Sequence, residues 1–172
     1  MFCLTICVIT NIVWTLKSSI AVALKQSKPF SSLEEELVLG IQHTADLLVR
    51  RFEELLKEYG VSGTQFNVLR ILRGAGEHGL RCGEIAERMV TRDPDITRLL
   101  DRLEKSGYIE RERDLQDRRV VITKIKKPGL QLLAKLDGPV RKLNVEMLRG
   151  IGPETLQSLV DGLDEIRDAL TE

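Results

Sequence analysis

The chain has 172 residues, of which 42% are hydrophobic and 30% are charged. This length allows a substantial buried core, and the composition excludes a disordered or fibrous protein. The formal net charge is zero, because 26 basic side chains balance 26 acidic ones. A strongly basic protein is therefore excluded, although residues 81–127 alone hold 13 lysines and arginines and only 10 aspartates and glutamates.

The first 24 residues are almost uncharged, and Lys17 is the single interruption. This segment is marginal in length for a transmembrane helix, and Lys17 would lie inside it. Ala21 and Ala23 resemble a signal-peptide cleavage site, but no basic region precedes the apolar stretch. Three interpretations stay open: a translation start assigned too early, a membrane anchor, or a folded extension. We favour the first, and we expect residues 1–30 to lie outside a single domain formed by residues 31–172.

Two capping patterns predict helices after this extension. Ser32 with Glu35 forms a capping box that opens a long helix over residues 32–59. Ser62 with Gln65 forms a second box, and apolar residues follow it at helical spacing. A glycine-bounded loop is expected after this second helix, at residues 74–79.

The next segment has the pattern of a helix, a tight turn and a second helix. Residues 84–90 form the first helix and residues 91–92 the turn. Asp93 can cap the second helix, with Pro94 at its first position, and Gly107 ends it. The two apolar faces comprise Ile85, Ala86 and Met89, then Ile96, Leu99, Leu100 and Leu103.

Beyond this helix the apolar period changes from 3.6 to 2, which predicts a two-stranded β-hairpin over residues 108–113 and 120–125. The polar loop between the strands presents Arg118 and Arg119 at its tip. Arginine suits a phosphate or a narrow minor groove. Asp117 can hold one of these guanidinium groups through a bidentate pair.

This order of elements is typical of a winged helix-turn-helix, in which the second helix enters the DNA major groove. Each feature alone is compatible with solvated surface, but their combination predicts binding to double-stranded DNA. Two alternatives stay open: a winged helix that binds a protein instead, supported only by the zero net charge, and a membrane-tethered regulator that depends on residues 1–24. An enzyme is not expected, because the chain has no phosphate loop, nucleophile elbow or paired catalytic carboxylates.

The run TRLLDRLEKSGYIERERDLQDRRVV, residues 97–121, closely resembles the MarR family of bacterial transcriptional regulators. The similarity covers roughly residues 33–170. One departure is the Lys-Lys-Pro-Gly run at 126–129, which replaces the usual Thr-x-x-Gly entry to the following helix. The resemblance implies a mainly α fold with a DNA-binding winged helix at about 61–127.

The resemblance also implies a homodimer built from terminal helices at about 32–59 and 128–171. Their apolar faces exceed what one small winged helix can cover, which favours the same arrangement. Such a dimer would act in the cytoplasm as a repressor, occupying a pseudo-palindromic operator.

Helix 94–106 and the hairpin supply the expected DNA contacts. Thr97 and Arg98 should meet bases or phosphates, Arg119 matches the family's minor-groove arginine, and Arg118 should meet a phosphate. The complete expected set is Arg92, Asp95, Thr97, Arg98, Arg102, Asp117, Arg118 and Arg119.

Relatives in this family often bind small aromatic or anionic effectors that release DNA. His43, Tyr59, Phe66 and Arg70 are possible lining residues here, although each also fits an ordinary core or surface role. No cofactor is expected. The cysteines and histidines do not have the spacing of a disulfide framework or a metal site, and Cys82 is expected to be a small packed residue.

Overall fold

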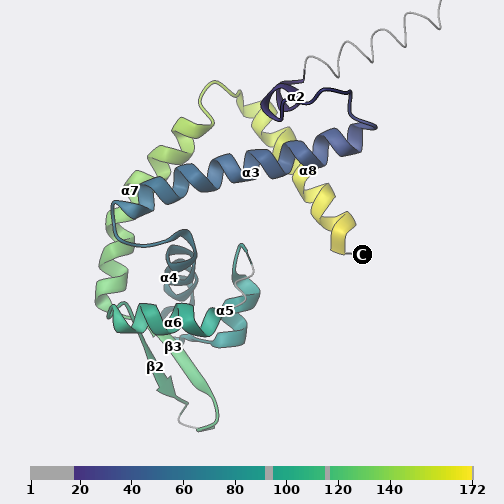
Figure 1. Ribbon diagram of the computed structural model, residues 1–172. Coiled ribbons are helices and arrows are strands. Elements are labelled where there is room, and N and C mark those ends of the chain that lie inside the picture. The colour runs from purple at the N-terminus through teal and green to yellow at the C-terminus, as the bar shows by residue number, and fades with distance from the viewer. Residues whose placement is uncertain (1–17, 92–94, 115–116, 172) are drawn as a thin grey trace, which may run out of the picture. The chain divides into compact units, whose positions relative to one another are not determined.

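The computed structural model describes residues 18–91, 95–114 and 117–171 (Figure 1). The described chain is mainly helical with one small antiparallel sheet, which confirms the expected fold class. It divides into two compact units, an N-terminal unit of residues 1–54 and a C-terminal unit of residues 55–172.

The N-terminal unit contains α2 (Ser19–Ala23) and most of α3 (Leu33–Lys57). At the start of α3, the Ser32 hydroxyl accepts the backbone N–H of Glu35 at 3.2 Å. The Glu35 carboxylate, however, accepts the backbone N–H and the hydroxyl of Ser31 at 2.6 and 2.5 Å. The cap is therefore shared between two serines instead of closing the predicted box.

The short helix α2 lies in the expected extension, where Ala21 and Phe30 are buried. Within the described residues, no helix is both long and apolar enough to cross a membrane. The anchor interpretation depends on residues 1–24, and residues 1–17 of this segment lie outside the described part of the chain.

The C-terminal unit opens with α4 (Gly63–Ala75), and its capping box between Ser62 and Gln65 is confirmed. The helix continues to Ala75, and a 3-10 turn, η1 (Gly76–His78), follows. The predicted loop at 74–79 is thus shorter than expected.

A three-stranded antiparallel sheet follows the order β1-β3-β2. The hairpin strands β2 (Ile109–Arg113) and β3 (Val121–Ile125) pair from Ile109↔Ile125 to Arg113↔Val121. The strand β1 (Leu80–Arg81) pairs with the middle of β3. The predicted two-stranded hairpin is confirmed. β1 was not predicted, because a strand of two residues has too few positions to show a period.

The helix-turn-helix consists of α5 (Cys82–Arg88) and α6 (Ile96–Lys105). The helix α5 begins and ends two residues before the predicted bounds of 84–90. Gly107, beyond α6, has a φ of +74°, which confirms its place in the left-handed conformation.

The helix α7 (Lys127–Met147) is continuous and contains Pro139 in its interior. Its N-cap Lys126 makes no side-chain capping bond, which agrees with the unusual residues at this junction. The final helix, α8 (Pro153–Thr171), buries none of its residues.

The core of the C-terminal unit is aliphatic and lies where α4 meets α5, α6, α7 and β3. It supports α6 and the hairpin. Its most buried members, all under 2% exposed, are Leu56, Val68, Leu69, Leu72, Ile85, Leu103, Ile109, Thr123, Leu133 and Leu136.

Candidate nucleic-acid interface

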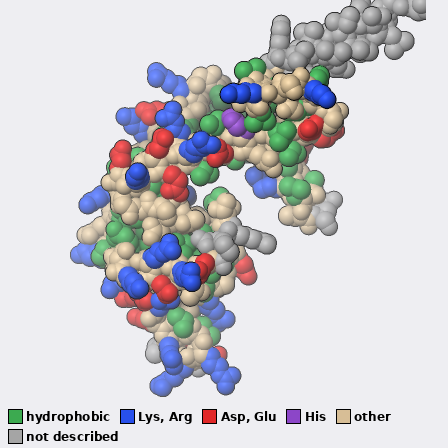
Figure 2. Space-filling model, in the orientation of Figure 1, with side chains coloured by type: hydrophobic (Ala, Val, Ile, Leu, Met, Phe, Trp, Pro, Cys, Tyr) green, Lys and Arg blue, Asp and Glu red, His purple; other side chains and the backbone are tan. Residues whose placement is uncertain are grey.

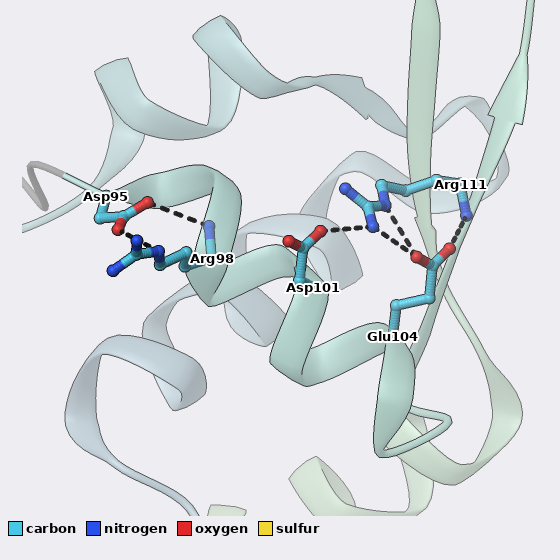
Figure 3. Close-up of polar contacts among 5 residues, drawn as sticks. All are labelled: Asp95, Arg98, Asp101, Glu104 and Arg111. Atoms are coloured by element: carbon cyan, nitrogen blue, oxygen red, sulfur yellow. Dashed lines mark hydrogen bonds and ion pairs between the residues drawn. The ribbon is translucent and has the colours of Figure 1, made fainter.

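The N-terminus of α6 is organised by Asp95. One carboxylate oxygen accepts the backbone N–H of Arg98 at 3.2 Å, as an N-cap, and the other lies 3.1 Å from the Arg98 Nε (Figure 3). The cap therefore lies later than the predicted Asp93, which is itself outside the described residues along with Pro94. Asp95 fixes both the start of the helix and the direction of an exposed arginine.

The two sides of α6 differ sharply in burial. Leu99, Leu100 and Leu103 are each at most 5% exposed and anchor the helix to the core, as their spacing predicted. Thr97 and Arg102 are exposed on the other side, as is Arg98, whose side chain is 77% exposed. The helix thus presents a polar, partly basic face that is accessible to a large partner.

A hydrogen bond joins α4 to the segment that follows α5. The side-chain oxygen of Asn67 accepts the backbone N–H of Val90 at 3.0 Å, across 23 positions of sequence. This bond gives the end of the α5 segment a partner that helix geometry alone does not provide. The sequence analysis did not identify Asn67, because its target is a backbone group with no sequence signature.

The hairpin tip is ordered by Asp117. Its carboxylate accepts the backbone N–H of Arg119 at 3.0 Å, and its own N–H donates to the Asp114 carboxylate at 3.0 Å. Asp117 therefore shapes the turn through backbone bonds, and its pairing with a guanidinium group stays a prediction. Arg118 and Arg119 are both exposed. Figure 2 shows the resulting concentration of basic side chains at the free end of the hairpin.

A cluster that the sequence analysis missed joins the hairpin to α6. Arg111 of β2 pairs with Asp101 and Glu104, which both lie on α6 (Figure 3). Hydrogen bonding from Arg111 lowers the pKa of the Glu104 carboxyl, and the same bonding raises the pKa of Arg111. Glu104 and Arg111 therefore stay charged at neutral pH.

The remaining predicted residues are placed less closely together. Arg92 lies outside the described residues. Phe66 is only 4% exposed, and the guanidinium carbon of Arg70 lies 5.8 Å from the centre of its ring. Tyr59 is half-buried in the same unit, whereas His43 belongs to the N-terminal unit. Arg70 is thus a neighbour of Phe66, as an effector site would need, but Phe66 also serves the core.

Comparison with known proteins identifies the family. The MarR family model matches residues 61–121. The chain is 31% identical over 139 residues to the HTH-type transcriptional regulator TtmR of Methylorubrum extorquens, covering 81% of this chain and 69% of that protein. The chain belongs to the MarR family.

Solved structures of MarR proteins share this fold. A MarR transcription factor from Planctomyces limnophilus is 35% identical, with a TM-score of 0.62, and covers 78% of this chain and 98% of its own. A mutant MarR from E. coli, complexed with operator DNA, is 25% identical with a TM-score of 0.69, covering 79% and 99%. This MarR-family protein is therefore a DNA-binding transcriptional regulator and not an enzyme.

Proposed function

We propose that this MarR-family protein is a homodimeric repressor that occupies a pseudo-palindromic operator. The observation that supports it most is the shared outer surface of α6 and the hairpin. There an exposed polar helix face, backed by buried leucines, accompanies a tip with two exposed arginines. A helix for the major groove beside a basic hairpin for the minor groove is the geometry that such recognition requires.

The proposed roles follow the exposure and chemistry of each side chain. Thr97 and Arg98 lie in the first turns of α6, the part of a recognition helix that contacts base edges. Arg119 enters the minor groove, Arg118 meets a phosphate, and Arg102 contributes a phosphate contact from the last turn of α6. Because acidic side chains accompany these arginines, we expect few phosphate contacts and a modest salt dependence.

The dimer is supported by apolar surface that remains open in one chain. The helix α8 carries four large hydrophobic side chains that are 40–80% exposed, and α3 carries six that are 38–76% exposed. Surfaces of this kind mark association sites, and a two-fold dimer covers the same patch on both copies. These side chains are Leu33, Leu37, Val38, Leu47, Leu48, Val49, Leu159, Val160, Leu163 and Leu170.

A dimer places two copies of α6 about one DNA turn apart, roughly 34–36 Å, so that each reads half of an inverted repeat. Sedimentation of the protein at micromolar concentration should give twice the chain mass of 19.5 kDa. A monomer at that concentration, in a folded sample, would contradict the proposed assembly.

Two wing substitutions test the DNA-binding assignment. Arg119→Ala should weaken operator binding by about 1–3 kcal/mol, because a specific contact is lost. Arg118→Ala should weaken all sequences alike and lower the salt slope by about one per subunit. Arg73→Ala is a suitable control, because Arg73 pairs with Asp137 on α7 and not with the hairpin. Operator binding by Arg119→Ala at the parent level would make the wing assignment wrong.

Release by a small aromatic or anionic effector is a further part of the proposal. Its support is limited to the pairing of Arg70 with Phe66, a cation beside an aromatic ring. A ligand releases DNA only if it binds the non-binding conformation more tightly. Titration with a small aromatic carboxylate such as benzoate should then weaken DNA retention, and Arg70→Gln should reduce this response.

A further inference from the structure

We propose that Arg111 is a positioning residue that holds the hairpin at a set angle to the recognition helix, so that both reach the DNA together. This inference rests on the proposed function, in which α6 and the hairpin contact neighbouring grooves. Arg111 itself is the middle residue of β2, away from the tip arginines, and its side chain is only 26% exposed.

The guanidinium and the backbone N–H of Arg111 both bind carboxylates of α6. Its backbone N–H donates to Glu104 Oε1 at 3.1 Å, and its Nε donates to Glu104 Oε2 at 3.0 Å. Its Nη2 donates to the same oxygen at 2.5 Å and to Asp101 Oδ1 at 2.6 Å. One guanidinium thus binds carboxylates on successive turns of α6, while its own backbone is bound as well (Figure 3).

We call Arg111, Asp101 and Glu104 together the clamp. The clamp restrains rotation of the hairpin relative to α6 more strongly than a single ion pair would. A guanidinium is planar and presents its N–H groups in a rigid fork, so two carboxylates bound to it define an orientation and not only a distance. The other described ion pairs of the hairpin are Lys124–Glu112 and Lys126–Glu110. They join residues of β2 and β3 to one another and to Lys126, which directly follows β3. They stiffen the hairpin but do not connect it to α6.

The position of the clamp matters, because a small rotation of the hairpin at Arg111 displaces the hairpin tip. Three residues, at about 3.3 Å each, separate Arg111 from Asp114, whose N–H donates to the carbonyl of Val120 beside Arg119; this is a length of about 10 Å. A rotation of about 10° at Arg111 therefore moves this end of the hairpin by about 2 Å, more than half the length of a hydrogen bond. Without the clamp, α6 and Arg119 would contact DNA independently, and the contribution of Arg119 would fall.

A double-mutant cycle in operator binding tests this reasoning. In the parent protein, Arg119→Ala should weaken binding by about 5-fold to 150-fold, the range that a specific contact implies. In an Arg111→Gln background the same change should weaken binding less than about 3-fold, because the tip no longer reaches its site. Additive effects of the two substitutions would overturn the proposal. Arg111→Lys keeps the charge but not the fork and should restore the coupling only in part.

Two controls separate positioning from stability and from charge. Arg73→Gln removes an ion pair with Asp137 that also joins distant elements, yet Arg119→Ala should keep its full effect in that background. The combined variant Asp101→Asn with Glu104→Gln removes the clamp while keeping Arg111. It should also abolish the coupling to Arg119, whereas a coupling that survives would overturn the proposal.

A measurement without DNA separates this inference from the proposed function. NMR relaxation of the full protein should show lower backbone order in β2 and β3 of Arg111→Gln, with α4 and α7 unchanged. If the parent protein binds no operator, the proposed function fails while this result still supports the clamp. Unchanged order in the hairpin would overturn the clamp, whatever the DNA result.

Discussion

The junction between the recognition helix, the hairpin and α7 depends on a glycine. Position 129, in the first turn of α7, lies directly against the chain that leaves α6. An added Cβ there would lie 2.6 Å from the Tyr108 carbonyl oxygen and 2.9 Å from Ile125 Cγ1. The same carbonyl accepts the backbone N–H of Lys126 at 2.8 Å, so the backbone cannot move without weakening that bond. Gly129→Ala should therefore destabilise the fold.

The expected size follows from three contributions. Overpacking against a backbone atom costs about 1–3 kcal/mol. A weakened hydrogen bond between Lys126 and Tyr108 adds up to about 1 kcal/mol. The lower flexibility of alanine in the unfolded chain offsets up to about 1 kcal/mol of this cost. The net loss should be about 1–3 kcal/mol, or an unfolding temperature lower by roughly 3–10 °C.

Calorimetry at one fixed protein concentration measures this change, because association would otherwise shift the transition. Gly74→Ala is the matched control: Gly74 lies near the end of α4, and an added Cβ would meet nothing within 4 Å. It should raise stability by up to about 1 kcal/mol. If Gly129→Ala unfolds at or above the parent temperature while the control behaves as expected, the close approach does not limit position 129.

Three further substitutions have defined outcomes. Asp95→Ala should cost about 0.5–2 kcal/mol of stability through the lost N-cap and free Arg98, whereas Asp95→Asn should keep most of the cap; equal thermal stability of the two would contradict this. Arg111 lowers the pKa of the Glu104 carboxyl, so the stabilisation from this pair is complete at neutral pH and is lost as the pH falls below about 4.5. The difference in unfolding temperature between the parent protein and Glu104→Gln should therefore become smaller below that pH. A difference that does not change with pH would contradict a stabilising pair. Leu133→Ala, at a fully buried site, should cost about 2–5 kcal/mol in urea unfolding, and a loss under 1 kcal/mol would place Leu133 outside the core.

Much of the helix-turn-helix could be predicted from periodicity and terminal signals. Leu99, Leu100 and Leu103 repeat at helical spacing, and all three are buried. Gly107 follows the helix, and it has the positive φ that its position predicted. These signals are local, because each depends on residues within about two turns of one another. Local patterns therefore located the recognition helix without knowledge of the fold.

The features that the sequence analysis did not predict depend on pairing between residues of different elements. β1 has two residues and exists only because it pairs with β3. The clamp joins Arg111 to Asp101 across ten positions and a change from helix to strand. No sequence period links residues across such a junction.

The most direct test of the account is retardation of DNA by the full protein at two salt concentrations. The probes are the DNA upstream of its own gene and a scrambled sequence of equal length. The account predicts retardation of the upstream DNA by a dimer, little retardation of the scrambled probe, and weaker binding at higher salt. A folded dimer that retards neither probe, or both equally, would contradict sequence-specific recognition by α6 and the hairpin.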